Sequence, residues 1–275
     1  MSFSVNGNPG ALVALQNLTA TEASLQTAQN EVSTGLAVAQ PSDNGALWAI
    51  AQNQRATASG LTTVTQSLQR VQSTVNVASS AGVTVSDLLN QLQSKALAAS
   101  DTSTNTASRS ALNSDFTSLL TQINSVISNA SFNGINLLNG SVTNLAALAS
   151  ADGTQKLTVN AQSLALGGAN ITVASTASIS TVTLAAAAVT AIDSSITNVN
   201  NALAKLGTSE NALQTQITFT GTLQDTIDTG VGNLVNANLA AESATLQALQ
   251  TKQQLGIQAL SIANTSSSAL LSLFR

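Results

Sequence analysis

The stretch of sequence that decides the fold is Val189–Leu234, VTAIDSSITNVNNALAKLGTSENALQTQITFTGTLQDTIDTGVGNL. Mostly apolar or small residues recur in it as two interleaved series with a period of seven, separated by alternating steps of three and four. The first series is Val189, Ile196, Leu203, Glu210, Ile217, Gln224 and Val231, and the second is Ile192, Val199, Leu206, Leu213, Thr220, Ile227 and Leu234. This spacing places one narrow stripe along a continuous helix about 70 Å long. We expect partner helices to cover it.

The expected partners are in the first half of the chain, where the same period recurs. One stripe consists of Leu61, Val64, Leu68, Val71, Val75, Ala78, Gly82, Val85, Leu89, Leu92, Ala96 and Ala99, and a shorter one of Leu112, Phe116, Leu119, Ile123, Val126 and Ala130. Three stripes in one register predict a coiled-coil-like bundle. The residues predicted to pack this rod are Leu61, Val64, Leu68, Val71, Leu89, Leu92, Phe116, Ile123, Ile192, Ile196, Val199, Leu203, Leu213 and Ile217.

Both ends of the chain carry weaker helical stripes. The N-terminal stripe begins at Ala11, and the C-terminal stripe runs from Leu239 to about Asn264, after which Ser266–Ser268 is expected to loosen the helix. Because such apolar ends need cover, we expect them to pair and then to contact copies of themselves. The residues predicted to carry this self-assembly are Leu15, Leu18, Leu25, Val32, Leu246, Leu249, Ile257, Leu260 and Phe274.

The helical pattern is interrupted at three places. Pro41–Asn44 predicts a turn and a helix start, and a Ser/Thr-rich joint occupies residues 100–108. The segment 139–183 contains Asn-Gly, Asp-Gly and Gly-Gly turn signals beside the short β-branched runs Lys156–Val159 and Ile171–Val173. The predicted fold is therefore mainly α, with long antiparallel coiled-coil-like helical rods and a small β-hairpin unit in the middle of the chain.

Composition excludes several classes of function. Charged residues make up only 7% of the chain and the net charge is −4, so nothing favours nucleic-acid binding. The absence of Cys and His removes thiolate and imidazole metal sites and nucleophile–histidine catalysis. Asp225 and Asp228 share a helix face, but no neighbouring residues complete a catalytic site. We therefore expect no enzyme activity, no metal and no cofactor.

The sequence also carries expectations about membranes and export. Apolar runs fall short of the ~18 residues that span a bilayer, so we expect no membrane insertion. The first 30 residues lack a basic start followed by a compact apolar block, so we expect export, if it occurs, without a cleaved signal peptide.

Several short motifs, in this order along the chain, resemble the bacterial flagellins, the subunits of the flagellar filament. The motif Ser131, Phe132, Asn133 and Gly134 is similar to the family's sequence at the end of the second rod helix. Further matching stretches are Val32–Leu36, Ser42–Ala51, Leu239–Ala244, Gln253–Asn264 and Leu271–Arg275. The resemblance covers about residues 1–140 and 185–275. Flagellins often carry Asp where this chain has Asn236 and Asn238.

The resemblance implies a domain plan for a short flagellin without large outer domains. Residues 1–35 and 240–275 would form a terminal helical inner-core domain, with 36–43 and 235–239 as a connecting spoke. Residues 44–140 and 185–234 would form a helical rod domain, and 141–184 a small β-containing outward segment. The chain would be a structural subunit that polymerises for swimming motility, outside the cell, as its terminal helices fold. Its partners would be copies of itself, the flagellar secretion apparatus, an export chaperone, and the filament cap and junction proteins.

Three alternatives to a filament subunit remain. A hook–filament junction protein shares the terminal motifs but would cap or join filaments. A binding module on a helical stalk would need a larger and more aromatic outer segment than residues 141–184. The flagellins that carry a zinc protease need a His-Glu-x-x-His motif, and this chain has no His.

Overall fold

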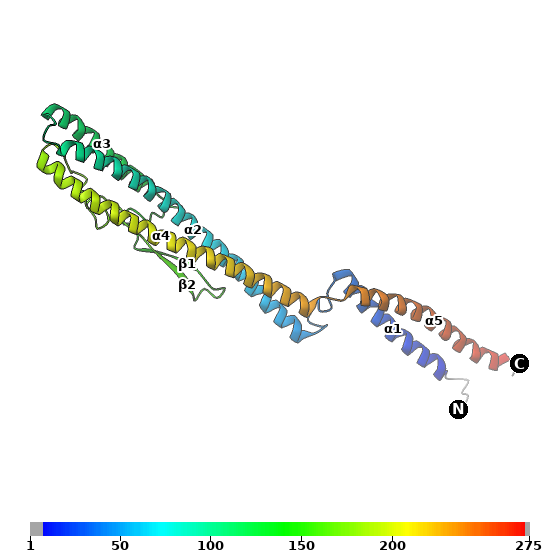
Figure 1. The fold of residues 1–275 in the computed structure, drawn as a ribbon. Coiled ribbons are helices and arrows are strands. Elements are labelled where there is room, and N and C mark those ends of the chain that lie inside the picture. The colour runs from blue at the N-terminus through cyan, green and yellow to red at the C-terminus, as the bar shows by residue number, and fades with distance from the viewer. Residues whose placement is uncertain (1–7, 273–275) are drawn as a thin grey trace. The chain divides into compact units, whose positions relative to one another are not determined.

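The structure, a computed structural model, describes residues 8–272, with side chains described through residue 265. Its elements are α1 (Pro9–Thr34), α2 (Gly45–Ser100), α3 (Thr106–Asn129), β1 (Asn144–Leu148), β2 (Lys156–Asn160), α4 (Val182–Val235) and α5 (Leu239–Ser272) (Figure 1). The expected fold class, mainly helical with a small β-hairpin, is confirmed. Thr57–Asp225 forms one compact unit, called here the central unit, and the rest of the described chain forms the terminal unit.

The core of the central unit follows the seven-residue stripes. Its helices α2, α3 and α4 lie side by side (Figure 1), and the side chains of Leu68, Leu89, Phe116 and Ile192 are fully buried. Gly82 belongs to the stripe because a Cβ there would lie 2.7 Å from Cδ2 of Leu203. Of the predicted packing residues, the buried ones are Leu61, Val64, Leu68, Val71, Leu89, Leu92, Phe116, Ile123, Ile192, Val199 and Leu213; Ile196, Leu203 and Ile217 are partly buried against the same core.

At the end of α4, in the terminal unit, the stripe does not continue as expected. Leu234 is 39% exposed, whereas Val231 and Val235 are buried with Val38 and Ala51. The change of face has a local cause, because the carbonyl of Val235 accepts hydrogen bonds from the backbone N–H groups of Ala37 and Val38 at 2.7 and 3.2 Å. The connecting segment is thereby held against the side of α4 that carries Val235.

The β-hairpin pairs different residues from those expected. Strands β1 and β2 are antiparallel, with Asn144 opposite Asn160, and the Asp152-Gly153 turn joins them. The run Ile171–Val173, expected to be a strand, forms only an isolated parallel bridge from Ile171 to Leu166. Its backbone is bonded to α4 instead: Thr172 donates its N–H to Oγ of Ser195 at 3.0 Å. Ile171 and Val173 are buried in the core of the central unit, and the run does not extend the sheet.

The joint between α2 and α3 is fastened by a buried arginine that the sequence analysis did not single out. Arg109 donates from Nε to the carbonyl of Ala99 at 2.8 Å, and from its Nη2 to the carbonyls of Asp101 and Thr104 at 3.0 and 2.9 Å. These carbonyls lie at and after the end of α2, where backbone acceptors have no partner in their own helix. Arg109 therefore satisfies them and fixes the turn between the two helices.

The Phe-Asn-Gly motif forms a tight turn after α3. Phe132 and Ile135 exchange two backbone hydrogen bonds of 3.0 Å, and the two residues between them have positive φ, 50° at Asn133 and 77° at Gly134. Asn-Gly is the pair that a two-residue turn of this kind requires. Ser131 and Phe132 are exposed.

The residue after this turn, Asn136, is buried, and its side chain makes several hydrogen bonds to the backbone. The sequence analysis did not single it out. Its amide donates to the carbonyl of Ile127 at 2.7 Å, and its Oδ1 accepts from the N–H groups of Leu138 and Asn139 at 2.8 and 3.1 Å. One side chain thus caps the end of α3 and orders the chain that leads to the hairpin.

Two expectations, one about the end of α5 and one about membrane-spanning segments, need correction. Helix α5 continues through Ser266–Ser268 to Ser272, because three serines lower helix propensity only modestly. Among the described helices, α4 is long and apolar enough to cross a membrane by length and composition, although no segment was expected to qualify. A bundle helix passes the same test, and Ile192, Val199 and Leu206 of α4 are buried in the core of the central unit.

Replacing the buried Phe116 and the exposed Phe219 in turn tests which side chains form the core. Phe116→Ala is expected to cost about 3–5 kcal/mol of unfolding free energy, because it leaves a cavity in the core. Phe219, 58% exposed on α4, provides the matched control, and its replacement by Ala should change stability by about 0.5 kcal/mol or less. Denaturant unfolding of the monomer, followed by circular dichroism, measures both. Equal losses would contradict the assigned core.

Candidate functional site

The candidate site is the pair formed by α1 and α5 in the terminal unit, where the two helices lie side by side (Figure 1). They run antiparallel, since Asn8 at the start of α1 donates from Nδ2 to the carbonyl of Ala263 near the end of the described part of α5, at 2.6 Å. The less exposed residues of each helix recur at steps of three and four. We call them the inner stripe; they are Ala11, Ala14, Leu18, Thr21, Leu25, Ala28 and Val32 on α1, and Glu242, Leu246, Leu249, Gln253, Gly256, Leu260 and Ala263 on α5.

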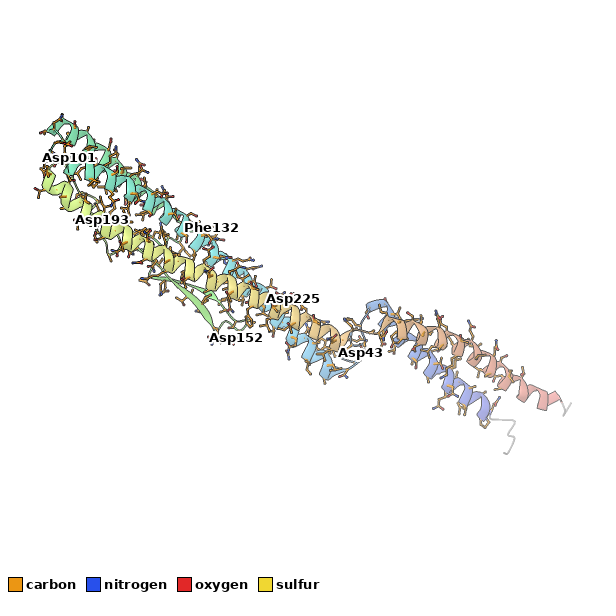
Figure 2. All side chains as sticks on the ribbon, in the orientation of Figure 1. Asp43, Asp101, Phe132, Asp152, Asp193 and Asp225 are labelled. Carbon is orange, nitrogen blue, oxygen red and sulfur yellow. The ribbon has the colours of Figure 1, made fainter. Side chains whose placement is uncertain are left out.

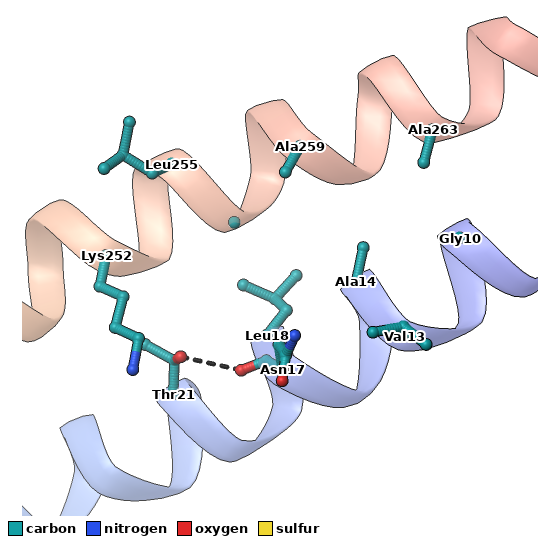
Figure 3. Close-up of a pocket in the computed structure, with 11 residues that line it drawn as sticks. Gly10, Val13, Ala14, Asn17, Leu18, Thr21, Lys252, Leu255, Ala259 and Ala263 are labelled. Atoms are coloured by element: carbon teal, nitrogen blue, oxygen red, sulfur yellow. Dashed lines mark hydrogen bonds between the residues drawn. The ribbon is translucent and has the colours of Figure 1, made fainter.

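Small residues let the two helices approach closely. A Cβ at Gly256 would lie 3.2 Å from Cδ1 of Leu18, so glycine makes room there for the leucine. Figure 3 shows the groove of about 440 Å³ beside this contact, with Ala14 and Leu18 of α1 facing Ala259 and Ala263 of α5. Thr21, which is buried, donates its hydroxyl to the carbonyl of Asn17 at 2.8 Å, the dashed line in Figure 3. The inner stripe therefore combines large side chains such as Leu18 with small residues such as Gly256 opposite them.

Both helices also carry large apolar side chains outside the inner stripe that remain about half or more exposed, and two of them, Val13 and Leu255, line the groove beside it. We call these residues the outer faces; they are Leu12 (69% exposed), Val13 (56%), Leu15 (49%), Leu255 (59%), Ile257 (53%) and Ile262 (69%). On α1, Leu12, Leu15 and Ala23 also line a shallow apolar groove. An exposed apolar surface of this kind marks an interaction surface in a folded protein.

The residues predicted for self-assembly therefore fall into two groups. Six belong to the inner stripe: Leu18, Leu25, Val32, Leu246, Leu249 and Leu260. Leu15 and Ile257 lie on the outer faces. Phe274 lies outside the described residues. The sequence analysis did not single out Gly256, although a glycine at a stripe position is a signal of close helix approach.

The connection between the paired helices and the rest of the terminal unit is held by backbone bonds. Gly35 ends α1 with a φ of 72°, and its carbonyl accepts from the N–H of Ala237 at 2.9 Å. Leu36 and Asn236 form an antiparallel bridge. Asn238 accepts from the N–H of Ala241 at 3.3 Å, so it serves as a cap for α5, a role for which Asn is as suitable as Asp.

One ionisable group of the pair, Glu31 near the end of α1, has a shifted pKa. Burial, and secondly the nearby Glu242 carboxylate, raise the pKa of Glu31 above its ordinary value. Asp43 adds to the same negative field. Its own carboxylate accepts the N–H groups of Ala39 and Gln40, each at 3.0 Å.

The acidic side chains of the described residues are dispersed. None of their Asp and Glu side chains gather in a group of three or more that could hold a metal ion. Asp101, Asp152 and Asp193 lie at separate points of the central unit (Figure 2), and Asp225 and Asp228 are both exposed.

Comparison with known proteins decides the family. Residues 5–143 match the model of the bacterial flagellin N-terminal helical region, and residues 189–274 match that of the C-terminal helical region. The chain belongs to the bacterial flagellin family. It is 54% identical over 272 residues to flagellin FljM of Caulobacter vibrioides, covering 99% of this chain and 98% of that protein. It is 36% identical over 285 residues to a flagellin of Brucella melitensis, covering 99% of both chains.

Two solved structures share the fold. A putative flagellar hook-associated protein from Vibrio parahaemolyticus superposes with a TM-score of 0.58 at 17% identity, covering 70% of this chain and 100% of that chain. Bacillus cereus flagellin superposes with a TM-score of 0.50 at 18% identity, covering 56% and 88%. At such low identity these matches show the fold alone. The family membership confirms the expected function, a structural subunit of the flagellar filament, and nothing favours the junction-protein alternative.

The close approach at Gly256 can be tested by adding a side chain there. Gly256→Val should lower the temperature at which filaments disassemble, because an added Cβ would lie 3.2 Å from Cδ1 of Leu18 and the two methyl groups would crowd this contact further. Gly207→Val is the matched control in α4, where a Cβ would meet nothing within 4 Å. Light scattering during heating compares the variants, and an unchanged midpoint for Gly256→Val would refute the close contact.

Proposed function

We propose that the chain polymerises by pairing α1 with α5 along the inner stripe and burying the outer faces of that pair against neighbouring copies. The observation that carries the proposal is the exposure of Leu12, Leu15, Leu255, Ile257 and Ile262 on helices that are already paired. Self-association buries the exposed part of these side chains, and each contributes less than the ~1.5–3 kcal/mol gained when a fully exposed side chain is buried.

The pair is too weakly packed to persist in an isolated subunit. Ordering a residue costs about 1–2 kcal/mol of conformational entropy, and most inner-stripe residues remain partly exposed. Only Thr21 and Ala28 of α1 are buried. Folding of the terminal helices is therefore coupled to assembly, which supplies the missing apolar burial.

We propose for this chain the domain plan that the flagellin family implies. Residues 1–35 and 240–275 form the inner core of the filament, and 36–43 with 235–239 form a spoke. Residues 44–140 and 185–234 form the rod layer, and 141–184 project outward. The low charge of 7% supports close lateral packing, because neighbouring rods have few like charges to separate.

The remaining partners and the location follow from the family. The chain is exported without a cleaved signal peptide through the flagellar secretion apparatus, is held before export by a chaperone, and contacts cap and junction proteins in an extracellular filament. It acts as a structural protein with no catalytic activity.

Two aspartate substitutions test the two surfaces separately. Leu260→Asp should abolish filament growth by opening the inner stripe, and Ile257→Asp should abolish it by placing a charge on an outer face. Gln258→Asp introduces the same charge between them without removing an apolar side chain, so it should weaken growth much less.

Elongation from sonicated filament seeds, observed by negative-stain microscopy, measures the effect. Normal tubes from Leu260→Asp and Ile257→Asp would contradict the proposal. Short closed oligomers of the unmodified chain that never elongate would favour the junction protein.

A further inference from the structure

The turn of the Phe-Asn-Gly motif contains a reactive pair of residues that the proposed function does not use. Asn133 and Gly134 form its corner, and both are exposed. In an Asn-Gly pair the glycine nitrogen can attack the side-chain amide of the asparagine, because glycine carries no side chain that obstructs the approach. This ring closure is the first step of deamidation, which converts asparagine into an acidic residue.

We propose that Asn133 is a site of spontaneous deamidation in the folded subunit, and that the fold makes it react faster than the other described Asn-Gly pairs, which begin at Asn44 and Asn139. A fourth pair, Asn6 and Gly7, lies outside the described residues. The proposal is independent of the proposed function, because the reaction takes place within one subunit.

The reaction consumes only water. The backbone nitrogen of Gly134 forms a bond to Cγ of Asn133, and its proton passes to the side-chain nitrogen, which leaves as ammonia. Water then opens the resulting five-membered imide ring. Attack at the former side-chain carbonyl carbon gives aspartate, and attack at the main-chain carbonyl carbon gives isoaspartate, in which the backbone continues through the side chain. Neither step changes an oxidation state.

The side chain of Asn133 is not anchored by a hydrogen bond to any described residue, and the N–H of Gly134 donates none to them. The side chain can therefore rotate toward this nitrogen without first losing a hydrogen bond. A Cβ at Gly134 would meet nothing within 4 Å, so water reaches the corner of the turn. Asn133 also has a φ of 50°, a conformation that is strained for a residue with a side chain, so opening of the turn relieves strain.

The pair at Asn139 is held much more firmly. Its Oδ1 accepts a hydrogen bond from the N–H of Ser141 at 2.9 Å, and its own N–H donates to Oδ1 of Asn136 at 3.1 Å. A Cβ at Gly140 would lie 3.1 Å from Oγ of Ser163, so this glycine is also covered from one side. Ring closure at Asn139 must first break the bond to Ser141.

The pair at Asn44 is restrained by its place at the start of α2. Its Oδ1 accepts from the N–H of Leu47 at 3.1 Å, and its main-chain carbonyl accepts from the N–H of Trp48 at 2.9 Å. These two bonds cap the helix, so ring closure would remove a cap that stabilises α2.

The product would place its new charge beside a cation. Asn133 lines a hollow of about 170 Å³ together with Phe132 and with Arg70 of α2. The described residues supply no ion-pair partner for Arg70. An aspartate at position 133 would share the hollow with this free guanidinium group. An isoaspartate would instead lengthen the backbone between Phe132 and Ile135 by one methylene group and weaken the two hydrogen bonds that close the turn.

Peptide mass spectrometry of the full chain, kept as a folded monomer in mildly alkaline buffer and sampled over time, tests the proposal. Conversion of an amide into a carboxyl group changes the peptide mass, and chromatography separates the aspartate and isoaspartate products. We expect Asn133 to deamidate severalfold faster than Asn139 and Asn44.

The same measurement in concentrated urea is the matched control. There each asparagine is still followed by glycine, but the hydrogen bonds of Asn139 and Asn44 are gone, so the three rates should approach one another. A folded-state rate at Asn133 no greater than the rates at the other two sites would overturn the proposal. The same preference in urea as in the folded chain would also overturn it, because the fold would then contribute nothing.

Discussion

A seven-residue repeat of apolar side chains is the constraint on which the rest of the structure depends, and its two versions behave differently. In the central unit the repeat contains large residues such as Leu68, Leu89 and Phe116, which are fully buried by three helices. In the terminal unit two helices share a stripe in which leucines alternate with small residues such as Ala28 and Gly256, and most of it stays partly exposed. One repeat thus produces a self-sufficient core and the other an incomplete one.

The incomplete stripe explains why the terminal helices are suited to assembly. A pair of helices can cover one face of each, and the outer faces of α1 and α5 retain residues such as Leu12 and Ile262, both 69% exposed. Additional copies can cover these faces without altering the inner stripe.

The sequence was sufficient to predict the long helices, because periodicity in a long element reports directly which face is buried. It was insufficient for short-range details that depend on a single contact. The strand partner of Lys156–Asn160 is Asn144–Leu148. The other candidate, the run around Thr172, is bonded to α4 through Ser195 instead. Arg109 and Asn136 belong to no periodic pattern, and their roles follow only from the carbonyls and N–H groups around them. The terminal stripes were visible in the sequence, but which of their residues face inward and which outward required the structure.

The measurement that tests the central claim most directly is amide hydrogen exchange, followed by mass spectrometry, on the same chain as monomer and as filament. If terminal folding is coupled to assembly, peptides from 9–34 and 239–265 exchange rapidly in the monomer and become protected in the filament. Peptides from 61–99 should be protected in both states. Equal protection of the terminal peptides in monomer and filament would contradict the account, because the α1–α5 pair would then be stable without neighbouring copies.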